Sequence, residues 1–252
     1  DTHQITIGNT YIGGDGSNQL MIAGPCAIES REQIEQSCQM LKQHGIRVLR
    51  AGCYKPRTSP YTFRGLGEDG LKLLAEMREK YGLLIATEMR DATHADKVVE
   101  YADIVQVGAK AMYDHGLLTA AGQSGKPVIL KRGFGSTLQE LVNCADFIMS
   151  CGNDQVILCE RGIRSFENNT RFTLDLCGVA WLKQHCNLPI ILDPSHAMGY
   201  AYGIGDLARA CTAMGIDGLL IETHPCPQCA QSDAPQQLNH QQFGEMYTSL
   251  KP

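Results

Sequence analysis

Four side chains of a mixed donor set lie far apart in the 252-residue sequence: the thiol of Cys26, the imidazole of His196 and the carboxylates of Glu222 and Asp233. This combination suits a divalent transition metal such as Zn, Fe, Mn or Co better than Mg or Ca, which prefer oxygen ligands alone. The spacing is not a local motif. These groups can therefore hold a metal only if the fold brings them together.

A second set of residues is cationic. Each member ends a short apolar run, directly follows one or lies in the loop after it: Arg50, Lys55, Arg57, Arg90, Lys110, Lys131 and Arg161. Gathering that much positive charge in one cavity costs self-repulsion unless an anion is bound there. Arg offers a bidentate contact to phosphate or carboxylate, and Lys offers a point charge. The set exceeds what one phosphate needs, so we infer either a pair of phosphate-bearing substrates or one phosphate with one carboxylate.

The apolar runs themselves predict buried strands. There are eight, over residues 20–23, 47–50, 83–87, 103–107, 127–130, 155–159, 189–192 and 218–221. Several are continuous in Val, Ile and Leu, as parallel strands covered on both faces require. Amphipathic stretches between them predict helices over 31–44, 68–81, 93–101, 136–151, 173–184 and 206–214, with Thr93 and Ser136 as N-caps.

Strands that alternate with helices imply right-handed βαβ units and a parallel sheet. Eight such units favour a closed (β/α)8 barrel, the TIM-barrel architecture, whose active site lies at the carboxyl ends of the strands. Residues 1–15 predict an N-terminal extension with a hairpin over 2–12 that covers the bottom of the barrel. The tail after Asn239 predicts a final helix. We expect one catalytic domain over residues 1–252 and no regulatory domain.

Composition narrows the class of protein. A formal net charge of -5 argues against a nucleic-acid partner, which usually requires a basic face. No apolar run reaches the length of a membrane span, and the N-terminus lacks the pattern of a signal peptide. The eleven cysteines are scattered through predicted helices and strands, so we interpret most of them as reduced, buried thiols of a cytoplasmic protein.

Cys226 and Cys229 form a CxxC pair just after His224. A structural zinc site would need two further ligands nearby, and none is close in sequence. A redox disulfide is the second possibility, although the thioredoxin-like context is missing. We favour the third interpretation, a loop with two incidental thiols.

The strings that carry these residues resemble one family along nearly the whole chain. They are Gly24-Pro25-Cys26-Ala27-Ile28-Glu29-Ser30, Lys55-Pro56-Arg57-Thr58-Ser59-Pro60, Lys131-Arg132-Gly133, Cys159-Glu160-Arg161-Gly162, Asp193-Pro194-Ser195-His196 and Ser232-Asp233-Ala234-Pro235-Gln236. The resemblance is to 3-deoxy-D-arabino-heptulosonate 7-phosphate (DAHP) synthase of the shorter bacterial and archaeal type, related to 3-deoxy-octulosonate 8-phosphate synthase. The Lys-Pro-Arg-Thr-Ser string favours the heptulosonate enzyme, because the octulosonate relative has an Asn-containing string there.

The resemblance implies a reaction and the residues that perform it. Phosphoenolpyruvate condenses with erythrose 4-phosphate to give DAHP and inorganic phosphate, the first step of the shikimate pathway to chorismate and the aromatic amino acids. By this resemblance one divalent metal, with manganese among the candidates, is held by Cys26, His196, Glu222 and Asp233. Substrate contacts are implied for Arg50, Lys55, Arg57, Thr58, Ser59, Lys110, Lys131 and Arg161. Lys55 is the expected proton donor, acting beside Cys26 and His196.

Two departures from the family pattern bear on the substrate. Lys110 stands where the family usually has Arg, which keeps the charge but loses the bidentate fork. Ala197 and Met198 follow His196 where small residues are usual, and would narrow the cavity. The alternatives are a synthase for another aldose phosphate such as arabinose 5-phosphate, a paralogue in secondary metabolism, or a non-catalytic anion-binding barrel. Family members are usually oligomers, so a homodimer or homotetramer is expected.

Overall fold

Eight parallel strands close into a barrel in the computed structural model, which describes residues 1–16, 18–55, 57 and 59–250. The strand order around the barrel is β10-β3-β4-β5-β6-β7-β8-β9. Their bounds are β3 Leu20–Gly24, β4 Val48–Arg50, β5 Leu84–Met89, β6 Ile104–Val107, β7 Val128–Lys131, β8 Val156–Glu160, β9 Ile190–Leu192 and β10 Gly218–Glu222. The predicted (β/α)8 barrel is therefore confirmed.

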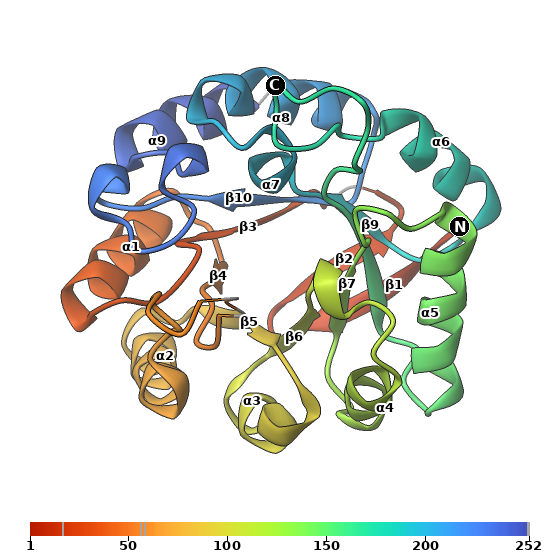
Figure 1. The fold of residues 1–252 in the computed structure, drawn as a ribbon, viewed down its shortest axis with the longest axis horizontal. Helices are drawn as coiled ribbons and strands as arrows, with labels where there is room; N and C mark the ends of the chain where they lie inside the picture. Colours follow the sequence, from red (N-terminus) through yellow and green to blue (C-terminus); the bar gives the residue numbers. More distant parts are fainter. Residues whose placement is uncertain (17, 56, 58, 251–252) are drawn as a thin grey trace.

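The helices surround the strands as an outer ring (Figure 1). They are α1 Arg31–Gln43, α2 Gly67–Tyr81, α3 Ala95–Tyr101, α4 His115–Gln123, α5 Leu138–Ser150, α6 Leu176–His185, α8 Ile204–Ala213 and α9 His240–Ser249. A short helix α7, Pro194–Met198, begins directly after β9. Single 3-10 turns, η1 Ala92–His94, η2 Ala109–Ala111, η3 Ala201–Gly203, η4 Pro227–Cys229 and η5 Ala234–Gln236, lie in the loops.

Two predicted N-caps were wrong by one or two residues. Asp91 caps η1 through its carboxylate, which accepts from the backbone N–H of Thr93. Thr137 rather than Ser136 caps α5, in a reciprocal capping box with Glu140. Ser136 instead donates its hydroxyl proton to the Gly133 carbonyl at 2.7 Å. The loop after β7 therefore closes on itself before the helix starts.

The N-terminal hairpin is present as predicted. Strands β1 Thr2–Ile7 and β2 Thr10–Gly14 pair antiparallel. Ile5, Ile7 and Ile12 are buried in one cluster with inward-facing barrel residues that include Leu20 and Leu220. The barrel residues in this cluster line the amino-terminal end of the barrel. The hairpin therefore covers the bottom of the barrel and leaves the opposite end open for the site.

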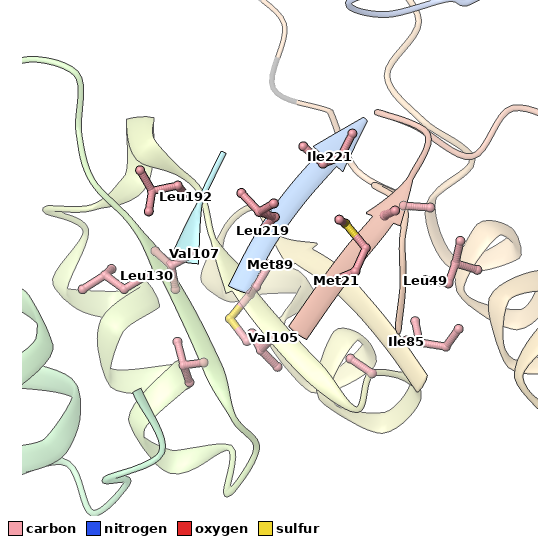
Figure 2. Packing of buried hydrophobic residues seen from close by; sticks show 14 of the residues in the cluster. Met21, Leu49, Ile85, Met89, Val105, Val107, Leu130, Leu192, Leu219 and Ile221 are labelled. Atoms are coloured by element: carbon pink, nitrogen blue, oxygen red, sulfur yellow. The ribbon is translucent and has the colours of Figure 1, made fainter. Parts of the chain in front are cut away.

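Outward-facing strand residues make the larger core with the helices. Figure 2 shows Met21, Leu49, Ile85, Val105 and Leu219 projecting from neighbouring strands in this layer. All are buried, so the strands are fixed between two apolar layers, at about 25 cal/mol for each Å² of apolar surface removed from water. Among the described residues, no helix has the length and apolar character that crossing a bilayer requires.

Candidate active site

The carboxyl ends of the strands surround a cavity of about 320 Å³. Its walls carry the metal-type donors and most of the predicted cations: Cys26, Arg50, Lys55, Arg57, Glu88, Lys110, Lys131, Arg161, Arg164, Arg171, His196 and Asp233. Each comes from the end of a barrel strand or the loop after it. The closure of β10 onto β3 brings Glu222 beside Gly24, which explains how residues nearly 200 positions apart converge.

The four predicted metal ligands do meet. Cys26, Glu222 and Asp233 each offer a ligand atom, and these atoms lie within 4.8 Å of one another. The Cys26 thiol donates to Asp233 Oδ2 at 3.3 Å. His196 approaches the group through Nε2, which lies 3.2 Å from Glu222 Oε1 and 3.6 Å from Asp233 Oδ2. The arrangement is thus a compact cluster of a thiol, an imidazole and two carboxylates.

Asp193 fixes the orientation of the His196 ring. Its carboxylate accepts from His196 Nδ1 at 2.6 Å and from the backbone N–H of His196 at 2.9 Å. Burial lowers the pKa of His196, against the opposing pull of the Asp193 and Glu222 carboxylates, and this favours the neutral ring. With the proton on Nδ1, a lone pair on Nε2 faces two carboxylates. That geometry fits a bound cation, and a carboxylate behind the histidine is a common support of metal sites.

The pKa shifts of Cys26 and Asp233 also fit a bound cation. Burial raises the pKa of the Cys26 thiol to about 12, and the Glu222 charge adds to this rise. Burial also raises the pKa of Asp233, but His196 and Arg171 outweigh it, and the net pKa lies below its usual range. A divalent ion reverses the penalty on the thiol, because it stabilises the thiolate directly.

Three neighbouring side chains hold the two carboxylates in place. Arg50 donates to Glu222 Oε1 at 2.6 Å, and both side chains are buried. Gln236 donates to the other Glu222 oxygen at 2.6 Å. Arg171 donates to the amide oxygen of that same Gln236 at 2.7 Å and lies 3.2 Å from Asp233 Oδ1. One connected network therefore supports both acidic ligands.

Arg161 is the cation whose charge is least satisfied. Its Nε and NH1 atoms are buried, with no hydrogen-bond partner among the described residues. The guanidinium lies 4.6 Å from the ring centroid of Phe172 and 5.9 Å from that of Phe134, and the two rings stack. Burial lowers its pKa. A buried guanidinium without a partner among the described residues is costly, and an anion bound here would offset that cost.

The other predicted cations differ in how free they are. Lys131 is paired with Asp193 inside the cavity. Lys55 is buried, and although burial lowers its pKa, the Cys26, Glu88 and Glu222 charges more than offset this, so the net pKa is raised. Lys110 lines the cavity from an exposed position.

Residues after β4 follow the prediction only in part. Arg57 lines the cavity and donates from Nε to the Phe63 carbonyl at 3.3 Å. Thr58 lies outside the described residues. The Ser59 hydroxyl accepts from the backbone N–H of Tyr61 at 3.3 Å, and Ser59 is absent from the described cavity lining.

Sequence reasoning placed one cation wrongly and missed two others. Arg90 is exposed and is absent from the described lining. Arg164 and Arg171 take part instead, from the β8–α6 loop. Backbone pairing of Ile163 with Thr173 folds this loop back over the barrel end. The two arginines stand in a segment without periodicity, so the only available signal was their proximity in sequence to Arg161.

A closed (β/α)8 barrel with a cationic cavity beside a buried cluster of mixed donors is the architecture of an enzyme that acts on anionic substrates. Residues 2–251 match the profile of the DAHP synthetase I family, and the chain belongs to this family. The predicted resemblance and the predicted class of enzyme, a DAHP synthase, are confirmed.

Individual relatives agree. The chain is 44% identical to the phospho-2-dehydro-3-deoxyheptonate aldolase of Thermotoga maritima, covering 100% of this chain and 72% of that protein. It is 32% identical to a 2-dehydro-3-deoxyphosphooctonate aldolase of Thiobacillus denitrificans, covering 92% of this chain and 88% of the relative. A crystal structure of the Thermotoga maritima DAHP synthase superposes with a TM-score of 0.96 at 44% identity, over 99% of this chain and 73% of the other.

Proposed function

We propose that this chain condenses phosphoenolpyruvate and water with erythrose 4-phosphate to give DAHP and inorganic phosphate, the first step of the shikimate pathway. The observation that carries the proposal is the buried Arg161 guanidinium, whose Nε and NH1 have no partner among the described residues, beside the donor cluster of Cys26, His196, Glu222 and Asp233. The guanidinium can bind a substrate phosphate. A metal held by the donor cluster can activate the aldehyde. The higher identity to a heptonate relative than to an octonate relative supports the choice of aldose.

We infer that Cys26, His196, Glu222 and Asp233 hold one divalent metal ion, of the Mn, Fe, Zn or Co type. Bound there, the ion supplies Lewis acidity to the aldehyde carbonyl of the aldose. The chain's own contribution is to orient the donors and to keep the carboxylate ionised. Asp193 orients the His196 ring through Nδ1, and Arg50 favours the ionised form of Glu222.

The cations divide the remaining work. Arg161 and Lys131, with Lys110 at the rim, bind the phosphate of phosphoenolpyruvate, and Arg50 with Lys55 binds its carboxylate. Arg57, together with Thr58, binds the phosphate of the aldose. Holding both substrates in contact accounts for much of the rate, since effective molarities of about 10⁵ M or more are reached this way. Lys55 is charged and buried next to Cys26, so it is positioned to donate the proton that the forming hydroxyl requires.

A phosphate-release assay tests the proposal. Purified protein is incubated with phosphoenolpyruvate and each of several aldose phosphates, with and without a chelator. We expect release with erythrose 4-phosphate, loss of release on chelation and recovery on adding Mn²⁺. Release with arabinose 5-phosphate alone contradicts the choice of aldose, and no release with any aldehyde contradicts the enzymatic role. Turnover that resists chelation contradicts the metal.

Arg171 offers a finer test of the network behind the ligands. Arg171→Leu removes the partner of Asp233 Oδ1 and of the Gln236 amide oxygen. We expect Mn²⁺ affinity to fall by about 10-fold, the usual scale for outer-shell partners. Arg164→Leu is the matched control, because Arg164 lines the same cavity but lies against the Phe134 ring, 4.8 Å from its centroid. Equal Mn²⁺ affinities in the two variants, measured by titration, would contradict the network.

Assembly and location stay predictions. We expect a homodimer or homotetramer in the cytoplasm, which sedimentation of the purified protein and fractionation of cells can check.

A further inference from the structure

The connection between β10 and α9 contains a disulfide that the proposed reaction does not use. Cys226 and Cys229 are bonded to each other, so the interpretation of two incidental thiols was wrong. The bond closes the turn η4, in which the Cys229 N–H donates to the Cys226 carbonyl at 2.8 Å. The other cysteines are free. This loop differs from the remainder of the chain in carrying the one cross-link that the described residues contain.

Both ends of the closed turn rest on one carboxylate. The Cys226 N–H donates to His224 Nδ1 at 3.0 Å, so the ring proton is on Nε2, which donates to Glu29 at 3.0 Å. The second Glu29 oxygen accepts from the Gln231 N–H at 2.8 Å. The disulfide lies in sequence between these two contacts. The disulfide therefore restrains the segment between His224 and Gln231, which Glu29 contacts at both ends.

The same loop joins two of the proposed metal ligands. Glu222 ends β10 just before the turn, and Asp233 follows the turn two residues after Gln231. Asp233 has φ 50° and is the only non-glycine residue with positive φ in the part of the chain that the structure describes. L residues rarely adopt this left-handed conformation, which persists only where neighbours impose it. The turn and the Glu29 contact at Gln231 hold the chain two residues before this position.

Solvent can reach the bond. Cys229 is exposed and Cys226 is half-buried, whereas the ligand Cys26 is buried. A soluble thiolate can therefore attack the Cys229 sulfur without entering the barrel. Reactivity of a disulfide depends on such access.

We propose that Cys226–Cys229 is a reversible redox site, reduced by a soluble dithiol, and that its reduction weakens the metal site through Asp233. The exchange is balanced: the Cys226–Cys229 bond takes up two electrons and two protons to give two thiols, and the dithiol becomes a cyclic disulfide. This inference rests on the proposed metal site and adds its regulation. Reduction frees the turn, so the conformation of Asp233 is no longer imposed from that side.

The test measures Mn²⁺ affinity and redox potential together. The protein is oxidised, or reduced with a dithiol that is then removed, and each form is titrated with Mn²⁺; the bond itself is followed by mass spectrometry after thiol alkylation. We expect the reduced form to bind Mn²⁺ about 10-fold more weakly. By linkage, saturating Mn²⁺ must then lower the midpoint potential of the bond by about 30 mV, the equivalent of that tenfold difference for a two-electron couple.

Serine variants provide the controls. Cys226→Ser with Cys229→Ser is expected to bind Mn²⁺ like the reduced protein, whatever the redox treatment. Cys177→Ser, which changes an exposed free cysteine in α6, is expected to respond like the unaltered protein. Equal Mn²⁺ affinity in both redox forms, or the absence of the bond in oxidised protein, overturns the inference alone. Failure of both forms to bind Mn²⁺ overturns the proposed metal site, and the redox linkage with it.

Discussion

Replacing Cys26 with alanine is expected to leave a folded protein that retains no stoichiometric metal and has lost its phosphate-releasing activity. Cys26 is buried against Glu222 and Asp233 and donates to Asp233 at 3.3 Å. Loss of an outer-shell partner alone costs about 10–100-fold in metal affinity, so loss of a direct ligand costs more than ~100-fold. Activity should fall in proportion to metal occupancy and recover partly in excess Mn²⁺.

Two measurements separate this effect from general damage. Metal content after dialysis reports the site, and thermal unfolding reports the fold. Cys38→Ala is the matched control, because Cys38 in α1 is equally buried, its pKa is also raised to about 12 by burial, and it lies away from the cavity. Full metal content in Cys26→Ala, or the same loss in Cys38→Ala, would remove Cys26 from the proposed ligand set.

The barrel was predictable because its signal is local and repeated. Every strand boundary predicted from the apolar runs lies within two residues of the observed one. The metal-type donors could be named from their chemistry, but their convergence depends on the pairing of β10 with β3, which no local pattern contains. The closed barrel brings these donors together, because its first and last strands, β3 and β10, must be neighbours.

Features that depend on the course of a loop were not predictable in this way. The helix expected from Thr173 begins at Leu176, because Thr173 pairs with Ile163 and Asp175 caps the helix instead. That pairing is what brings Arg164 and Arg171 to the cavity. Similarly, the thiols of Cys226 and Cys229 are three residues apart in any conformation, and only a tight turn joins them. Irregular loops lack the periodicity on which sequence reasoning depends.

Arg161→Met is expected to separate function from stability, with opposite signs. Nε and NH1 of Arg161 are buried without a partner in the described part of the chain, so the guanidinium is held there at a cost. Methionine keeps the packing against Phe172 and removes that cost, and we expect the free energy of unfolding to rise by about 1 kcal/mol, or about 2–4 °C in Tm. Affinity for phosphoenolpyruvate should fall about 10²-fold, because truncating a buried charge contact costs roughly 2–5 kcal/mol.

Arg132→Met is the matched control, one strand end away. Arg132 is buried to the same degree as Arg161, but it donates to Glu160 at 2.7 Å and to Asp175 at 2.8 Å. Removing it leaves the fully buried Glu160 carboxylate without its cationic partner, which costs about 3–5 kcal/mol and lowers Tm by at least ~6 °C. Melting curves with and without phosphoenolpyruvate decide the matter, since ligand should raise Tm in the unaltered protein and not in Arg161→Met. If both variants lose stability alike, Arg161 forms a structural ion pair with a carboxylate of the chain. A different residue then binds the anion in the cavity.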